Sequence, residues 1–123
     1  IESGMGIHGE PGIMLSDRMP ADELVDMLMK KLLDDMPLAD GDRVSVMING
    51  LGATSLEELY IVYRAVQKQL SGIGVSILMP HVGEYSTSME MAGMSISIFK
   101  LDEELEGLLA DEAITPFYTN VNK

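Results

Sequence analysis

The chain has 123 residues, close to the usual size of one domain, so a single hydrophobic core is expected. Its formal net charge of −12 excludes nucleic acid as a partner and disfavours anionic membrane surfaces, because both are bound through clustered Lys and Arg. There is no cysteine and no apolar run long enough to cross a bilayer, so a soluble protein of the cytoplasm is expected.

The first expected element is a short strand over residues 2–7, which runs into a glycine-rich turn over residues 4–12. Four glycines and a proline surround His8 and Glu10 there, so the backbone must turn sharply around the two groups able to do chemistry. Residues 13–19 carry no clear period and are expected to form a loop. A helix over residues 21–36 follows, with an apolar stripe made by Leu24, Met27, Leu28, Lys31 and Leu32 and widened by Val25, Met29 and Leu33.

The middle of the chain predicts a strand, a tight turn and a second helix. Residues 43–49 alternate and place Val44, Val46 and Ile48 on one face. The turn at residues 50–55 offers two overlapping capping boxes, one starting at Thr54 and one at Ser55. The helix after it, residues 56–70, carries a stripe of Leu56, Leu59, Tyr60, Tyr63, Val66 and Leu70.

The last third predicts two strands and one short helix. A strand over residues 74–79 is limited by Pro80, and residues 82–88 form a polar turn before a brief helical turn at residues 89–92. Residues 94–100 alternate most regularly, and Asp102 caps a helix that contains Leu105, Leu108 and Leu109. An irregular tail is expected from Thr115. This order predicts an α/β fold, a two-layer sandwich with a mixed sheet.

Several local patterns have a plain structural interpretation beside a functional one. The spacing Gly4-x-Gly6-x-x-Gly9 spells the dinucleotide fingerprint, but no helix is expected at its third glycine, so that interpretation is weak. A metal site made by His8, His81 and Glu10 has no supporting ligand spacing. His81 is expected at the surface. The turn at residues 50–55 could bind an anion with its amides, although a well-capped corner is the more ordinary interpretation.

Three stretches together resemble the substrate-binding subunit of the dihydroxyacetone kinases. They are Gly4-Met5-Gly6-Ile7-His8-Gly9-Glu10-Pro11-Gly12, then Ile48-Asn49-Gly50-Leu51-Gly52-Ala53-Thr54-Ser55 with its helix start, and Val82-Gly83-Glu84-Tyr85-Ser86-Thr87-Ser88-Met89-Glu90-Met91-Ala92-Gly93. The resemblance runs from Gly4 to Pro116 in the family's order and spacing.

The resemblance implies that His8 is the catalytic residue, which attacks the ketone carbon of dihydroxyacetone and holds it as a covalent hemiaminal. It places the fold with the second domain of the dihydroxyacetone kinases and the DegV-like architecture. Residues 1–123 would then be the C-terminal part of the subunit, with an N-terminal domain that carries the acid/base residues missing, and the first residue, Ile rather than Met, agrees with a start further upstream.

The resemblance also implies partners. No cofactor or metal is expected on this chain, because the phosphate donor, ATP-Mg or ADP-Mg, is expected on a nucleotide-binding subunit or domain, in some bacteria recharged by the sugar phosphotransferase relay. A homodimer is expected, and residues 1–123 alone should not transfer phosphate. Two alternatives stay open: a dihydroxyacetone-sensing regulatory paralogue that keeps His8, and a lipid-binding protein of related fold in which His8 is incidental.

Overall fold

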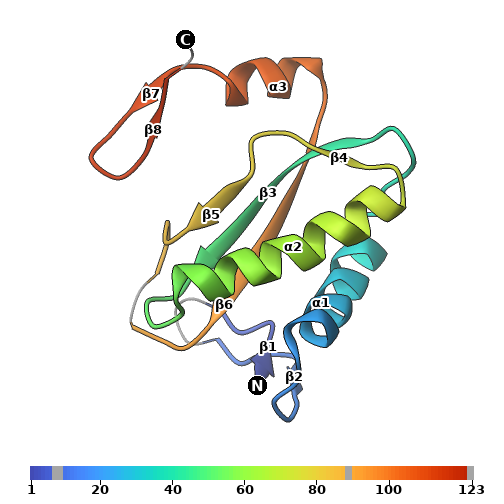
Figure 1. The fold of residues 1–123 in the computed structure, drawn as a ribbon, viewed down its shortest axis with the longest axis vertical. Coiled ribbons are helices and arrows are strands. Elements are labelled where there is room, and N and C mark those ends of the chain that lie inside the picture. The colour runs from blue at the N-terminus through green and yellow to red at the C-terminus, as the bar shows by residue number, and fades with distance from the viewer. Residues whose placement is uncertain (7–9, 88–89, 122–123) are drawn as a thin grey trace.

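The computed structural model describes residues 1–6, 10–87 and 90–121 (Figure 1). None of the helices in that part of the chain is long and apolar enough to span a membrane. The elements in chain order are β1 Glu2–Ser3, β2 Met14–Leu15, α1 Ala21–Asp35, β3 Arg43–Gly50, α2 Leu56–Gly72, β4 Ser76–Ile77, β5 His81–Gly83, β6 Met94–Leu101, α3 Glu103–Leu109, β7 Ala113–Ile114 and β8 Thr119–Asn120.

The central sheet and the helices α1 and α2 form two layers around one core. Val44, Val46 and Ile48 of β3 are completely buried, as their alternation predicted, and they pack in one cluster with residues of both helices. Ile96 and Ile98 of β6 extend the same cluster. Both helices therefore cover one face of the sheet, and α2 crosses in front of it in Figure 1.

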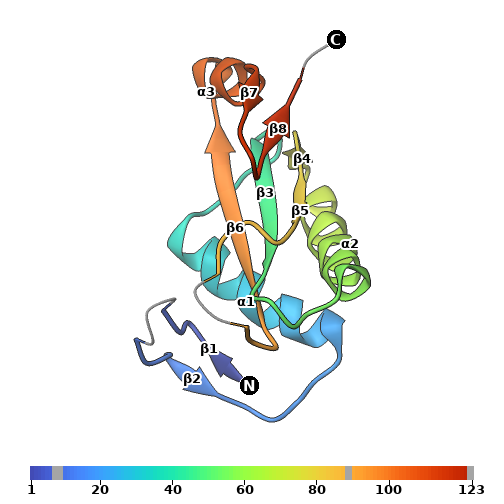
Figure 2. The ribbon, with the colours of Figure 1, turned by 90° about the vertical axis from the view of Figure 1, so that its left-hand side faces the viewer.

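β3 is the strand on which the sheet is built. β6 pairs with it antiparallel along all of its length, from Arg43 opposite Leu101 to Gly50 opposite Met94. β4 and β5 pair with it parallel, over residues 43–44 and 47–49. The sheet is thus mixed, as the sequence predicted, and Figure 2 shows β6, β3 and β5 side by side.

β4 and β5 pair with the same edge of β3, one after the other, and are separated by a bulge. Val44 lies opposite Ile77 and Met47 opposite His81, so residues 78–80 face residues 45–46, three against two. Met79 has a positive φ of 51°, and its carbonyl accepts a hydrogen bond from the Ser45 hydroxyl at 3.0 Å. The buried Ser45 thus compensates for a ladder bond that the bulge removes.

Several short strands differ from the sequence-based expectation. The strand expected over residues 2–7 extends only over β1, and it pairs with β2, inside the segment expected to be a loop. Residues 81–83, expected as surface and turn, form β5. The tail is a hairpin of β7 and β8 rather than irregular. The helical turn expected at residues 89–92 overlaps residues outside the described part, and Met91 forms an isolated bridge with Gly52.

The helices lie where they were predicted, but their buried faces are rotated. On α1 the fully buried residues are Val25 and Met29, so the core face is centred beside the predicted stripe. On α2 the buried residues include Val62 and Ala65, whereas Tyr60, expected in the core, is 52% exposed. A tyrosine at the rim keeps its hydroxyl in water, and the small Ala65 allows close packing.

Candidate functional site

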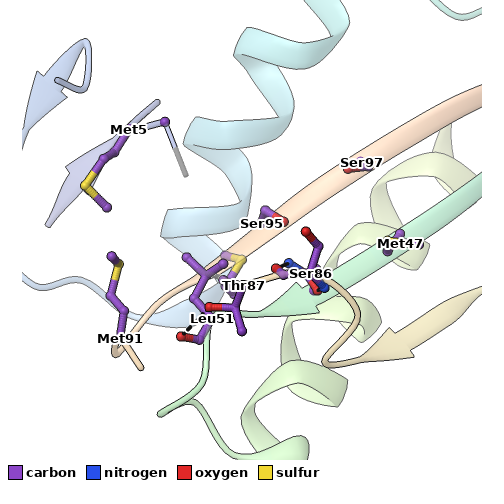
Figure 3. A pocket seen from close by; sticks show the side chains of 11 residues that line it. Met5, Met47, Leu51, Ser86, Thr87, Met91, Ser95 and Ser97 are labelled. Carbon is purple, nitrogen blue, oxygen red and sulfur yellow. Dashed lines mark hydrogen bonds between the residues drawn. The ribbon is translucent and has the colours of Figure 1, made fainter. Parts of the chain in front are cut away.

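A pocket of about 250 Å³ opens on the face of the sheet that the helices leave uncovered. Asn49 and Met47 of β3 and Ser95 and Ser97 of β6 form its floor, because these positions alternate with the core residues of the same strands. Figure 3 shows that Met5 and Met91 lie over one end of this floor. The remaining residues that line the pocket are Gly6, Leu51, Ser86, Thr87 and Met94.

The pocket lies where the three sequence stretches meet. Met5 and Gly6 come from the first glycine-rich turn, Asn49 and Leu51 from the end of β3. The segment after β5 adds a third side with Ser86, Thr87 and Met91. None of the lining residues that the structure describes is charged, so the pocket suits a neutral ligand with a few polar groups.

Asn49 holds the segment after β5 against the end of β3. Its side chain is only 5% exposed, and its Oδ1 accepts hydrogen bonds from the backbone N–H of Tyr85 at 2.8 Å and of Ser86 at 2.9 Å. Its Nδ2 donates to the Ser86 carbonyl at 2.6 Å. Three hydrogen bonds from one buried amide fix the course of the segment that forms this wall of the pocket.

The turn after β3 is tied to the same segment by further hydrogen bonds. The Met91 N–H donates to the Leu51 carbonyl at 2.8 Å, and the Leu51 N–H donates to the Gly93 carbonyl at 3.1 Å. The Thr54 hydroxyl donates to the Gly93 carbonyl at 2.7 Å. Ser55 is the N-cap of α2 and accepts from the Glu58 N–H at 3.3 Å, so of the two possible capping residues, Thr54 and Ser55, the second is the one used.

The first glycine-rich turn is closed by contacts across it. The Gly6 N–H donates to the Glu10 carbonyl at 3.0 Å, and a Cβ at Gly6 would lie 2.0 Å from the Glu10 carboxylate. A larger residue at position 6 would therefore displace the Glu10 side chain from its present position. His8, the predicted catalytic residue, lies outside the described residues, so its role stays a prediction. Its sequence position is two residues after Gly6, which lines the pocket.

Residues 10–20 contain no helix, and α1 begins only at Ala21. A dinucleotide fingerprint needs a helix directly after its glycines, so this finding agrees with the low weight given to that interpretation. Among the described residues no group of three His, Asp or Glu side chains could hold a metal ion. The combination of His8, His81 and Glu10 lies partly outside those residues.

His81 is part-buried and engaged away from the pocket, which corrects its expected place at the surface. Its Nε2 lies 2.9 Å from the Tyr118 hydroxyl, in the turn between β7 and β8. The ring of Tyr85 stands edge-on to it at 5.9 Å. Burial, with smaller contributions from Tyr118 and Tyr60, raises the pKa of the Tyr85 hydroxyl above its ordinary value. The contact of His81 with Tyr118 attaches the C-terminal hairpin to β5.

Sequence reasoning did not single out Asn49 or Ser86 as functional residues. Asn49 occupies a strand position that alternates with Ile48 and Gly50, and a polar amide at the end of a buried strand is itself a signal of a specific partner. Ser86 gave no such signal, because its role comes from its backbone.

Residues 1–117 match the Dak1 domain. The chain belongs to the Dak1 domain family. Within that family it is 48% identical, over 118 residues, to the dihydroxyacetone-binding subunit DhaK of a PTS-dependent dihydroxyacetone kinase 2 of Listeria innocua, covering 96% of this chain and 36% of that protein. It is 45% identical, over 119 residues, to an L-erythrulose kinase of Pectobacterium atrosepticum, covering 94% of this chain and 20% of that protein.

Solved structures of similar sequence share the fold. The dihydroxyacetone kinase from C. freundii, solved with AMP-PNP and Mg²⁺, has a TM-score of 0.79 at 32% identity, over 95% of this chain and 21% of that one. A dihydroxyacetone kinase operon co-activator, DhaQ, has a TM-score of 0.80 at 29% identity, over 89% of this chain and 34% of that one. The α/β fold with a mixed sheet is confirmed. The chain spans between a fifth and about two fifths of the curated relatives' lengths.

Proposed function

We propose that this Dak1 chain is the part of a ketose kinase that binds dihydroxyacetone, and that His8 holds the ketone covalently while a partner domain phosphorylates a hydroxyl group. The observation that carries the proposal is the uncharged pocket at the junction of the three family stretches. Its wall includes Gly6, two residues before His8 in the sequence. The names of the relatives support a short ketose as the ligand, since they are kinases of dihydroxyacetone and erythrulose.

The chemistry assigned to His8 is an addition that leaves all atoms in the product. A neutral imidazole nitrogen attacks the ketone carbon, the C=O π bond opens, and the oxygen takes up a proton to become a hydroxyl. The ring nitrogen that carried hydrogen gives up that proton, so the net change is addition of one ketose. Glycerol has no carbonyl and cannot form this bond, so the reaction itself supplies selectivity.

Fixing the ketone also positions the hydroxyl group that must attack phosphorus. Phosphoryl transfer depends mostly on such positioning and on charge stabilisation. The phosphate donor, ATP-Mg or ADP-Mg, would be held by a separate nucleotide-binding subunit or domain in the cytoplasm, and the acid/base groups by a further domain of the subunit. The same proposal includes a homodimeric subunit and a fold related to the DegV-like architecture.

The experiment is an intact-protein mass spectrum after mixing with dihydroxyacetone, for the wild type, His8→Ala and His81→Gln. The chain has two histidines, and His81 does not line the pocket, so His81→Gln is the matched control. A gain of one dihydroxyacetone in the wild type and His81→Gln, but not in His8→Ala, is expected. An equal gain in His8→Ala would refute the role of His8.

A second function is favoured by one specific observation. The co-activator DhaQ matches this fold as closely as the kinase does, so a ketose-sensing regulator is the second candidate. Both candidates bind the ketose at the same pocket, and only the first leads to product. Formation of dihydroxyacetone phosphate when the chain, in its complete subunit, is mixed with the nucleotide-bearing partner distinguishes the kinase from the regulator.

A further inference from the structure

The orientation of the Asn49 amide is fixed by its neighbours. Two backbone N–H groups, those of Tyr85 and Ser86, point at one end of the amide, so that end must be the oxygen. The other end faces the Ser86 carbonyl and must be the nitrogen. Asn49 is 5% exposed, so its amide group is held in this arrangement by a buried network.

One N–H of the Asn49 amide has no acceptor among the residues that the structure describes. The amide nitrogen carries two hydrogens, and among the described residues only the Ser86 carbonyl accepts one of them. Asn49 lines the pocket. A buried donor without a partner is costly, and a ligand oxygen in the pocket would supply the missing acceptor.

The rest of the pocket indicates what kind of ligand carries that oxygen. Met5, Met47, Met91, Met94 and Leu51 give it an apolar wall, and Ser95, Ser97 and Thr87 offer hydroxyl groups. The described lining contains no cation to hold a carboxylate or phosphate, and the chain carries a net charge of −12 that repels anions. The pocket therefore favours a small neutral polyhydroxylated molecule over a phosphorylated or fatty-acid ligand.

We infer that Asn49 is a ligand-binding residue, whose free N–H donates to an oxygen of the neutral ketose, and that the phosphorylated product is bound more weakly than the substrate at this site. The inference rests on the proposed function and adds a specificity-determining residue to it. The Asn49 amide would thus both shape the wall of the pocket and contact the ligand, so its NMR signals should change when the ligand binds.

The test is NMR of the nitrogen-15-labelled protein, in which the two side-chain protons of Asn49 give separate signals. Adding dihydroxyacetone is expected to shift the signal of the free proton strongly and that of the Ser86-bound proton little. Dihydroxyacetone phosphate at the same concentration is expected to shift neither. Asn49→Ala is expected to raise the Kd for dihydroxyacetone about tenfold, the effect of losing one hydrogen bond to a ligand.

Thr54→Val is the matched control for loosening of the loops. Thr54 joins the same two segments through its bond to the Gly93 carbonyl but does not line the pocket, so the Kd should stay near that of the wild type. If the ketose is captured while neither Asn49 proton moves, the inference is wrong and the proposed function stands. Equal Kd values for Asn49→Ala and Thr54→Val would also overturn it. If the wild type binds no dihydroxyacetone, both fail. Should Asn49→Ala not fold, the NMR shifts decide alone.

Discussion

At Gly52 the turn after β3 passes so close to the next segment that no side chain fits. Its φ is +115°, and an added Cβ would lie 2.7 Å from the Glu90 Cα, a backbone atom that cannot move without displacing the pocket wall. Gly41 also has a positive φ, +87°, but a Cβ there would meet nothing within 4 Å. The two positions therefore separate backbone strain from steric conflict.

We predict that Gly52→Ala lowers the free energy of unfolding by roughly 3 kcal/mol, because strain and overlap add, and Gly41→Ala by about 1 kcal/mol from strain alone. Urea denaturation of the two variants beside the wild type measures both values. Equal losses would show that the contact with Glu90 is relieved without cost and that the two segments are not held together as described.

Sequence reasoning at the residue scale succeeded where the signal is local. Asp102 was predicted as a helix cap and Ser55 as one of two possible caps beside Thr54, and the side chains of Ser55 and Asp102 both accept a backbone N–H three residues on. Asn49 was missed as a site residue because its partners, Tyr85 and Ser86, lie 36 and 37 positions further along the chain. No spacing rule within one element reveals a hydrogen bond of that range.

At the scale of elements, α1 offers a direct test of which face is buried. Met27 and Met29 were both assigned to its apolar stripe, but Met29 is completely buried in the core and Met27 is only half-buried. The hydrophobic period was right and its centre was displaced, because the packing of α1 against α2 and the sheet selects the face.

Met29→Ala is predicted to destabilise the fold by about 2–5 kcal/mol and Met27→Ala by less than about 1 kcal/mol. Both replacements remove the same side chain from the same helix, so helix propensity cancels in the comparison. Thermal or urea unfolding gives the difference. A larger loss at Met27 would contradict the face assigned to the core.

The long elements were predictable, whereas of the short strands only β1 and β4 lie within predicted strands, and both are shorter than predicted. α1, α2, β3 and β6 each have a period that spans eight or more residues, which local sequence reveals. β2, β5, β7 and β8, which were not predicted, have two or three residues each and exist through their pairing partners. β5 pairs with β3, 34 positions earlier, after a bulge at residues 78–80 that no local pattern announces.

At the scale of the whole molecule, the charge balance is the dominant electrostatic feature. The chain has twelve more acidic than basic residues. Two of the ion pairs described are long and contribute little, Arg64 with Asp22 at 3.7 Å and Lys100 with Asp42 at 3.6 Å. Arg43 with Glu106, at 2.7 Å, is closer and partly buried, but one such pair does not offset the excess of carboxylates. Net repulsion among carboxylates should therefore oppose the compact state, and salt should screen it.

Raising NaCl from about 10 mM to about 150 mM is predicted to increase the free energy of unfolding, by on the order of 1 kcal/mol, since the Debye length falls by a factor of about four. Urea titrations are suitable, because urea carries no charge. Lower stability at the higher salt concentration would mean that attractive pairs outweigh the repulsion.

The central claim is that this Dak1 chain captures a short ketose through His8. The most direct measurement is the carbon-13 NMR spectrum of dihydroxyacetone labelled at its ketone carbon and bound to the protein. A signal in the region of tetrahedral carbons, present in the wild type and His81→Gln and absent in His8→Ala, is the predicted result. Bound dihydroxyacetone whose labelled carbon keeps its ketone signal in the wild type would contradict the covalent mechanism.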